Sequence, residues 1–377
     1  MIYLYYTDRF MDYELSPDHP MKPARLMLTH ALMGESGLLD EDDIRVIEPY
    51  LASERDLLQI HDKAYIDAVK AEKPDLSFGL GDVDTPVFKG MYDASRLIAG
   101  SSMEAAESLI RSDCRAMNIA GGLHHAFPSK AGGFCVFNDP ALAIVRLKDK
   151  FKRILYIDID GHHGDGVQEI FYQDPDVLTI SMHESGKYLF PGTGFIEEVG
   201  RGPGKGYCVN IPMPQYSGDE AYVHAFEEII PSLFNWFRPK AVVAQIGIDT
   251  HYSDPLTSLR LTLGGYCSLI QRICELSDRY CEGRLLALGG GGYSLSVVPL
   301  AWTMAFQIMR GQKMPHLPCR FVELFENVTG LEPISLPDSG PVIRPGSRER
   351  LMAELDETLG GLKAVLNSIH GICPGPK

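Results

Sequence analysis

The sequence contains 8 Cys residues but no pair in C-x-x-C spacing. This absence argues against a cysteine ligand set for a metal and is typical of proteins in a reducing compartment. No apolar run is long enough to span a membrane, and residues 1–6 lack the basic flank and cleavage site of a signal peptide. We therefore expect a cytoplasmic protein with no membrane partner.

Basic residues are also scarce, since 35 Lys and Arg stand against 50 Asp and Glu for a net charge of −15. Binding to a phosphate backbone needs a basic face, so this balance disfavours nucleic acid as a direct partner. An acidic protein remains compatible with a basic peptide or an amine as substrate.

What the sequence does contain is an alternation of short apolar strands with helices. Strands are expected at 1–6, 116–120, 154–157, 241–248 and 285–288, and helices near 23–36, 53–71, 91–112, 139–150, 218–236 and 264–281. This alternation predicts an α/β fold with a parallel sheet covered on both faces. Polar residues follow four of the strands directly, and ligands in such folds bind at the carboxyl edge of the sheet.

Residues 158–166, which read DIDGHHGDG, follow one of these strands. Alternate residues of a strand point to the same face, so Asp158, Asp160 and His162 are expected to project together where the strand runs out. A turn rich in Asp and Gly is the alternative, but a turn does not require two adjacent His residues. The segment therefore favours a functional site.

Asp249 follows another strand of the same edge and completes a set of oxygen and nitrogen donors with Asp160 and His162. Three protein ligands and one open position are what a catalytic divalent metal requires. Zn²⁺ is the first expectation, and a carboxylate-rich site also accepts Fe²⁺, Co²⁺ or Mn²⁺. Taken alone, Asp249 is more typical of a turn or a helix cap.

His124 and His125 are adjacent, which suits acid–base work beside a metal site better than joint ligation of one ion. Asp158 and Asp165 are available to orient the two imidazoles. Tyr293 follows four glycines and could donate to a developing oxyanion, although a flexible loop with a packed Tyr is the alternative. Together these residues predict a metal-assisted hydrolase.

Six motifs make the sequence similar to one known family. They are residues 19–23 (HPMKP), 122–126 (GLHHA), 133–139 (GFCVFND), 158–166 (DIDGHHGDG), 190–194 (FPGTG) and 289–293 (GGGGY). At these residues the sequence resembles the histone deacetylase superfamily, which includes acetoin-utilisation deacetylases and acetylpolyamine amidohydrolases. The resemblance implies an arginase-like three-layer α/β fold with a central eight-stranded parallel sheet.

The resemblance also implies roles for single residues. Zn²⁺ would be held by Asp160, His162 and Asp249. His125 with Asp165 would act as general base and acid, His124 with Asp158 as electrostatic partner, and Tyr293 would hold the acetyl oxygen. The implied substrate-binding residues are Asp84 at the rim, Gly133, Phe134 and Phe190 in the tunnel, and Leu256 at the tunnel mouth. Two structural K⁺ or Na⁺ sites are implied, one at Asp158, Asp160, His162, Ser181 and Met182, and one at Phe171, Asp174, Val177 and Tyr207.

Several positions depart from the patterns of related enzymes, and three of them bear on the site. Gly161 replaces a bulkier residue between two ligands, which predicts a looser site floor. His251 stands where arginases carry an Asp for a second metal, so a single ion is expected. Leu256 stands where polyamine-selective members carry a glutamate, which favours peptide substrates.

Residues 1–315 are expected to form the catalytic domain and residues 316–377 a C-terminal extension. Within the extension, residues 333–346 are rich in Pro, Gly and Ser and are predicted to be a linker. An amphipathic helix is predicted at 347–369, with leucines 351, 355, 359, 362 and 366 on one stripe.

The leading hypothesis is hydrolysis of the acetyl amide of Nε-acetyl-lysine in proteins or peptides. A second is a deacetylase for small molecules, acting on acetylated polyamines or acetoin-related compounds. A third is a metal-bound interaction module without turnover, which the intact constellation disfavours. The oligomeric state is left open.

Overall fold

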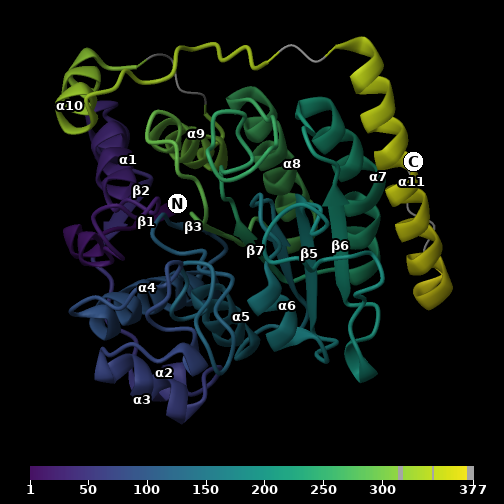
Figure 1. Ribbon diagram of the computed structural model, residues 1–377, viewed down its shortest axis with the longest axis horizontal. Coiled ribbons are helices and arrows are strands. Elements are labelled where there is room, and N and C mark those ends of the chain that lie inside the picture. The colour runs from purple at the N-terminus through teal and green to yellow at the C-terminus, as the bar shows by residue number, and fades with distance from the viewer. Residues whose placement is uncertain (313–316, 342–343, 372–377) are drawn as a thin grey trace.

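The computed structural model describes residues 1–312, 317–341 and 344–371, and its centre is one sheet of parallel strands (Figure 1). The spatial order of the strands is β2-β1-β3-β8-β7-β4-β5-β6. Their bounds are β1 Ile2–Tyr5, β2 Ile44–Ile47, β3 Arg115–Asn118, β4 Ile154–Asp158, β5 Val177–Glu184, β6 Cys208–Met213, β7 Ala241–Gln245 and β8 Leu285–Leu288. The predicted eight-stranded parallel sheet is confirmed.

Helices cover both faces of the sheet (Figure 1). The helices α1 (Ala24–Glu35), α9 (Val298–Arg310), α8 (Leu263–Cys281) and α7 (Asp219–Phe237) pack side by side in this order along one face. The helices α4 (Met91–Arg111), α5 (Asp139–Lys148) and α6 (Asp165–Phe171) pack along the other. Side chains along each strand point alternately to the two faces of the sheet, so each strand contributes to the apolar cores on both faces. In β4, Leu155 and Ile157 enter one apolar core while Ile154 and Tyr156 enter the other.

The helix predicted at 53–71 is two helices, α2 (Glu54–Leu57) and α3 (Lys63–Ala71). Ser53 and Asp56 form a capping box that starts α2. The chain then turns, and Asp62 lies at the N-cap position of α3. The sequence pattern reads as one continuous amphipathic helix, but capping residues divide the segment into two helices.

The described residues of the C-terminal segment form two helices rather than one. α10 (Cys319–Thr329), which was not predicted, lies beside α1, whereas the predicted amphipathic helix is α11 (Pro345–His370) and lies at the opposite side of the molecule against α7 and β6 (Figure 1). Leucines 355, 359, 362 and 366 of α11 are buried. The predicted domain boundary at 315/316 and part of the predicted linker at 342–343 lie outside the described residues.

Among the residues that the structure describes, no helix combines the length and the apolar character needed to cross a membrane. The seven cysteines described are all free, and five of them are buried.

Candidate active site

The carboxyl ends of β4 and β7 bring the three predicted ligands together. Asp160 and His162 follow β4, Asp249 follows β7, and one donor atom from each lies within 4.8 Å of the others. Nδ1 of His162 is 2.8 Å from Oδ2 of Asp249 and 3.3 Å from Oδ1 of Asp160. All three side chains are buried.

The remaining carboxylate oxygens of this cluster accept hydrogen bonds from fixed N–H groups. Gln245 Nε2 and the Gly291 amide both donate to Oδ2 of Asp160 at 2.7 Å, and the Gly161 amide donates to Oδ1 of Asp249 at 2.6 Å. Such outer contacts orient the ligating atoms. Gln245 was not predicted from the sequence as a site residue. The signal that could have identified it is a polar residue at the end of the apolar strand β7.

Two carboxylates that are buried side by side repel each other when both are ionised. Burial and the neighbouring Asp160 raise the pKa of Asp249 to about 7, because a second negative charge is disfavoured there. An oxygen and nitrogen donor set with a convergent centre suits a divalent ion such as Zn²⁺. The residues present therefore fit a catalytic metal.

The glycine run at 289–292 passes directly behind this cluster. Gly290 has a φ of +82°, and a Cβ at Gly291 would lie 2.3 Å from Oδ2 of Asp249. The buried Arg25 donates to the carbonyl oxygens of Gly290 (2.8 Å) and Gly292 (3.1 Å), which holds the run in place. Glycine is needed here for close approach, as expected, but the role of Arg25 was not predicted.

The prediction of a looser floor at Gly161 is wrong. A Cβ at this position would lie 2.7 Å from Cγ2 of Thr257 and 3.1 Å from Oδ1 of Asp249. Thr257 fills the space that a larger residue would occupy, and its hydroxyl donates to the Asp249 carbonyl oxygen at 2.5 Å. The floor is closed by a residue from another loop.

Asp158 does not project with Asp160 and His162 toward one point, because β4 ends at Asp158 and strand alternation stops there. Its Oδ2 accepts instead from Nδ1 of His124 at 2.7 Å and from the Tyr156 hydroxyl at 2.6 Å. Nδ1 of His125 makes the matching bond to Asp165 at 2.7 Å. Both predicted imidazole–carboxylate pairs are therefore formed.

The two imidazoles have opposite electrostatic environments. Burial opposes the charged form of His124, but Asp158 and Asp160 outweigh burial and raise its pKa to about 9. Burial and the adjacent charge of His124 lower the pKa of His125 to about 4. A protonated His124 thus stands beside a neutral His125, with their Nε2 atoms 3.0 Å apart.

One cavity of about 220 Å³ leads to this cluster. It is lined by all five predicted substrate-binding residues, by His125, His162 and Tyr293, and by Leu189, which was not predicted. His124 is not among the lining residues, so only one of the two imidazoles is open to the cavity. Ring contacts shape the walls, since Phe134 lies 5.6 Å from Tyr293 and Phe190 lies 5.1 Å from His125 between ring centroids.

Tyr293 faces the cavity at the end of the glycine run. Its backbone amide donates to Oδ2 of Asp254 at 2.7 Å, which fixes the residue. Burial and the carboxylate of Asp249 raise the pKa of the phenol well above its usual value. The hydroxyl therefore stays protonated and can donate a hydrogen bond.

His251 does not face the cluster. Its Nε2 lies 2.8 Å from Oδ2 of Asp338, and its Nδ1 lies 2.9 Å from the Ser253 hydroxyl. Both ring nitrogens are thus occupied. Within the described residues, Asp160, His162 and Asp249 form the one group of ligand type, which agrees with a single ion.

The residues of the first predicted monovalent site lie at and just after the carboxyl end of β4 and in the middle of β5, where Asp158 and Ser181 are register partners. Those of the second gather at the start of β5. There Asp174 donates to the Phe171 carbonyl at 3.0 Å and Val177 to the Asp174 carbonyl at 3.3 Å, while Tyr207 accepts from Thr179 at 2.9 Å. Occupation of these places by K⁺ or Na⁺ stays a prediction.

Comparison with known proteins places this geometry in a family. Residues 19–309 match the histone deacetylase domain. The chain is 40% identical to an acetoin utilization protein AcuC of Bacillus subtilis over 89% of this chain and 88% of that protein, and 40% identical to a probable deacetylase of Archaeoglobus fulgidus over 77% and 80%. The crystal structure of a histone deacetylase homolog from Aquifex aeolicus superposes with a TM-score of 0.84 at 32% identity, over 96% of this chain and 99% of that one. The chain therefore belongs to the histone deacetylase family, whose members are metal-dependent hydrolases of acetyl amides.

Proposed function

We propose that this protein is a zinc-dependent deacetylase that removes the acetyl group from Nε-acetyl-lysine in proteins or peptides. One observation carries the proposal: the cluster of Asp160, His162 and Asp249 lies at the end of a narrow cavity that His125 and Tyr293 also line. A slot with apolar walls and a few polar groups at its end suits a methylene chain that carries one amide.

The residues divide the chemistry of amide hydrolysis. A divalent ion on the three ligands would supply Lewis-acid polarisation of the acetyl carbonyl. His125, neutral and open to the cavity, takes a proton from the attacking water and later delivers it to the leaving amine. His124 stays protonated and stabilises the developing negative charge, while the Tyr293 hydroxyl donates to the oxyanion. The products are acetate and a free amine.

Two residues at the cavity mouth support a peptide substrate. Leu256 is apolar and offers no partner to the distal cation of a polyamine. Forgoing such a charge-assisted contact costs about 1.5–3 kcal/mol, or roughly 10–150-fold in affinity. The exposed Asp84 lines the same mouth and could accept hydrogen bonds from the backbone amides of a peptide.

The test compares kcat/KM for an acetyl-lysine peptide and for N-acetylputrescine, with metal content measured on the same sample. We expect the peptide to be preferred, Leu256→Glu to shift the ratio toward the polyamine, and Asp84→Ala to harm peptide turnover most. Higher wild-type kcat/KM on the polyamine, or an unchanged ratio in Leu256→Glu, would contradict the peptide assignment.

A deacetylase for small molecules is the second candidate. It is favoured by the similarity to a protein named for acetoin utilization across most of both chains. It would use the same ligands and the same acid–base pair. A preference for small acetylated substrates in the experiment above would select it.

A further inference from the structure

A second cavity, of about 540 Å³, lies beside the active-site tunnel. Two loops form walls of both. In the first loop, Leu189 and Phe190 line the tunnel while the preceding Tyr188 lines the second cavity. In the other, Leu256 lines the tunnel mouth while Arg260 lines the second cavity. The two cavities are therefore linked through two shared loops.

Cations dominate the second cavity although the protein carries a net charge of −15. Arg260 comes from the loop after β7, and Arg344 and Arg350 come from the start of α11; Glu354 is the one acidic residue that lines it. Among the residues that the structure describes, no carboxylate forms an ion pair with any of these three arginines. Three guanidinium groups against one carboxylate leave a positive site in an acidic protein.

The next arginine on the same helix behaves differently. Arg348 is paired with Glu220 of α7 and does not line the cavity. Its pairing stabilises the packing of α11, whereas the unpaired arginines face an open space. This difference separates a structural cation from cations that are free to bind a ligand.

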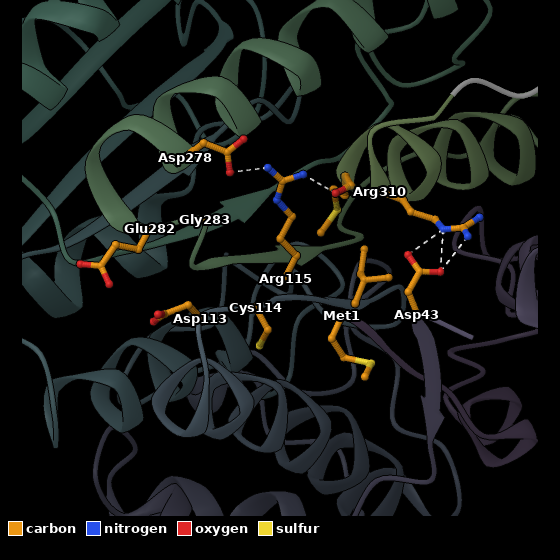
Figure 2. A pocket seen from close by; sticks show the side chains of 11 residues that line it. Met1, Asp43, Asp113, Cys114, Arg115, Asp278, Glu282, Gly283 and Arg310 are labelled. Atoms are coloured by element: carbon orange, nitrogen blue, oxygen red, sulfur yellow. Dashed lines mark hydrogen bonds and ion pairs between the residues drawn. The ribbon is translucent and has the colours of Figure 1, made fainter. Parts of the chain in front are cut away.

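A pocket at the amino end of the sheet provides a second contrast (Figure 2). It also contains charged side chains, but each of them has an ion-pair partner, and Asp113 and Glu282 both pair with Arg284. Arg115 pairs with Asp278, and Arg310 pairs with Asp43, as the dashed lines in Figure 2 show. The charges of that pocket hold the fold together, so it does not call for an ionic ligand.

Arg260 is also held in position for binding. Its guanidinium carbon lies 4.6 Å from the ring centroid of Tyr216. Tyr216 has a φ of +66°, a conformation that is unfavourable for a bulky residue, and its side chain is 48% exposed. The strained backbone places an aromatic ring under the cation at the surface, where it restrains the arginine without neutralising its charge.

We propose that this cavity binds an anionic group, a carboxylate or a phosphate, carried by the acetylated substrate close to its acetyl-lysine. The inference rests on the proposed function, because it assigns the part of the substrate that stays outside the tunnel. Guanidinium groups bind carboxylate and phosphate oxygens through paired, charge-assisted hydrogen bonds. The enzyme would thus select acetylated sites in an acidic or phosphorylated sequence.

The test uses metal-loaded, full-length protein and a set of acetyl-lysine peptides. A single glutamate is moved one residue at a time away from the acetyl-lysine on either side, and phosphoserine, glutamine and lysine replace it at the best position. We expect kcat/KM for the best acidic peptide to exceed that of its glutamine counterpart by about tenfold, through KM rather than kcat. Phosphoserine against glutamate distinguishes the two anions, and added salt should reduce the preference.

The double variant Arg260→Gln/Arg350→Gln should lose the preference while turnover of the glutamine peptide stays unchanged. Arg348→Gln is the matched control and should retain it. Equal kcat/KM for acidic and neutral peptides at every position, or equal loss in the control variant, would overturn the inference. Failure of the proposed function itself would look different, because the neutral peptide would then not be hydrolysed at all, while calorimetry would still report whether the acidic peptide binds.

Discussion

At the scale of single residues, the two adjacent imidazoles are the same chemical group but differ in their access to the cavity. His125 lines the cavity and His124 does not, although each is hydrogen-bonded to a carboxylate at 2.7 Å. In the proposed mechanism, His125 is therefore the imidazole that serves both the attacking water and the leaving amine. We therefore attribute the different proposed roles of the two histidines to their different access to the cavity.

We expect His125→Ala to reduce kcat by about 10²–10⁴-fold, the usual contribution of a general acid–base, and His124→Ala to reduce it less. In the proposed mechanism, His125 is required twice in the cycle, whereas His124 acts through its charge. Steady-state kinetics on an acetyl-lysine peptide measure the order, with equal metal content as the control. A larger loss in His124→Ala would exchange the two roles.

The site residues that follow the strands could be predicted from the sequence because they lie in short motifs. The ligands, the histidine pair and Tyr293 all follow apolar runs, so their convergence at one edge was predictable. The residues that hold these site residues in place could not be predicted. Thr257 is remote in sequence from Gly161, and Arg25 is remote from the glycine run at 289–292. No local pattern indicates that a threonine or an arginine side chain will pack beside a distant glycine.

At the scale of elements, the C-terminal segment is tied to the loop that carries Asp249. The carboxylate of Asp338, buried with its partner, accepts from the His251 ring at 2.8 Å and from the amide of Leu263, the first residue of α8, at 3.0 Å. A residue outside the matched family domain thus fixes a loop of the metal site.

Asp338→Ala should lower the free energy of unfolding by about 1–3 kcal/mol for each of the two donors involved, since it leaves a buried ring and a helix-end amide without their acceptor. Asp338→Asn keeps an acceptor oxygen and should cost less. Urea unfolding measures both, and competition with a chelator should show weaker metal retention in Asp338→Ala alone. Identical stability of the two variants and wild type would show that the contact is dispensable.

A second junction between elements should make the fold sensitive to acid. His61, between α2 and α3, is 2% exposed; its Nδ1 donates to the Phe127 carbonyl and its Nε2 accepts from the Asn138 amide, both at 3.0 Å. Burial lowers its pKa from 6.5 to about 4. The neutral ring is the form that the fold accepts, so its contribution is full above pH 6.5 and is lost as the pH falls toward 4.

The expected loss over this window is on the order of 3 kcal/mol. Urea midpoints measured from neutral to acidic pH should fall more steeply for wild type than for His61→Gln, which cannot titrate. Parallel profiles for the two proteins would assign the acid sensitivity to other groups.

At the scale of the whole molecule, the parallel sheet and its two helical layers were predictable from alternation, but its outer parts were not. β2 and β6 are edge strands without a motif, and the resemblance, not the pattern, supplied the count of eight. α10 escaped prediction because its two buried residues, Phe321 and Phe325, form too short a stripe. α11 was predictable because its leucines repeat over many turns.

The leucine stripe of α11 should be a principal attachment of the extension to the rest of the protein. Leu359→Ala should lower the free energy of unfolding by about 2–5 kcal/mol, whereas the exposed Glu357→Ala on the same helix should change it little. Thermal unfolding of the two variants provides the comparison. Equal melting temperatures would indicate that the helix does not contribute to the stability of the sheet.

The position of α11 also bears on how the chain is made. The helix packs against β6, an edge strand. Without this cover, the unpaired backbone groups of β6 could form hydrogen bonds with a strand of another chain. During synthesis, β6 emerges long before α11, because two further strands and four helices lie between them. A ribosome-bound chain must therefore carry a bare sheet edge for much of its translation, so chains released before α11 are the ones we expect chaperones to retain.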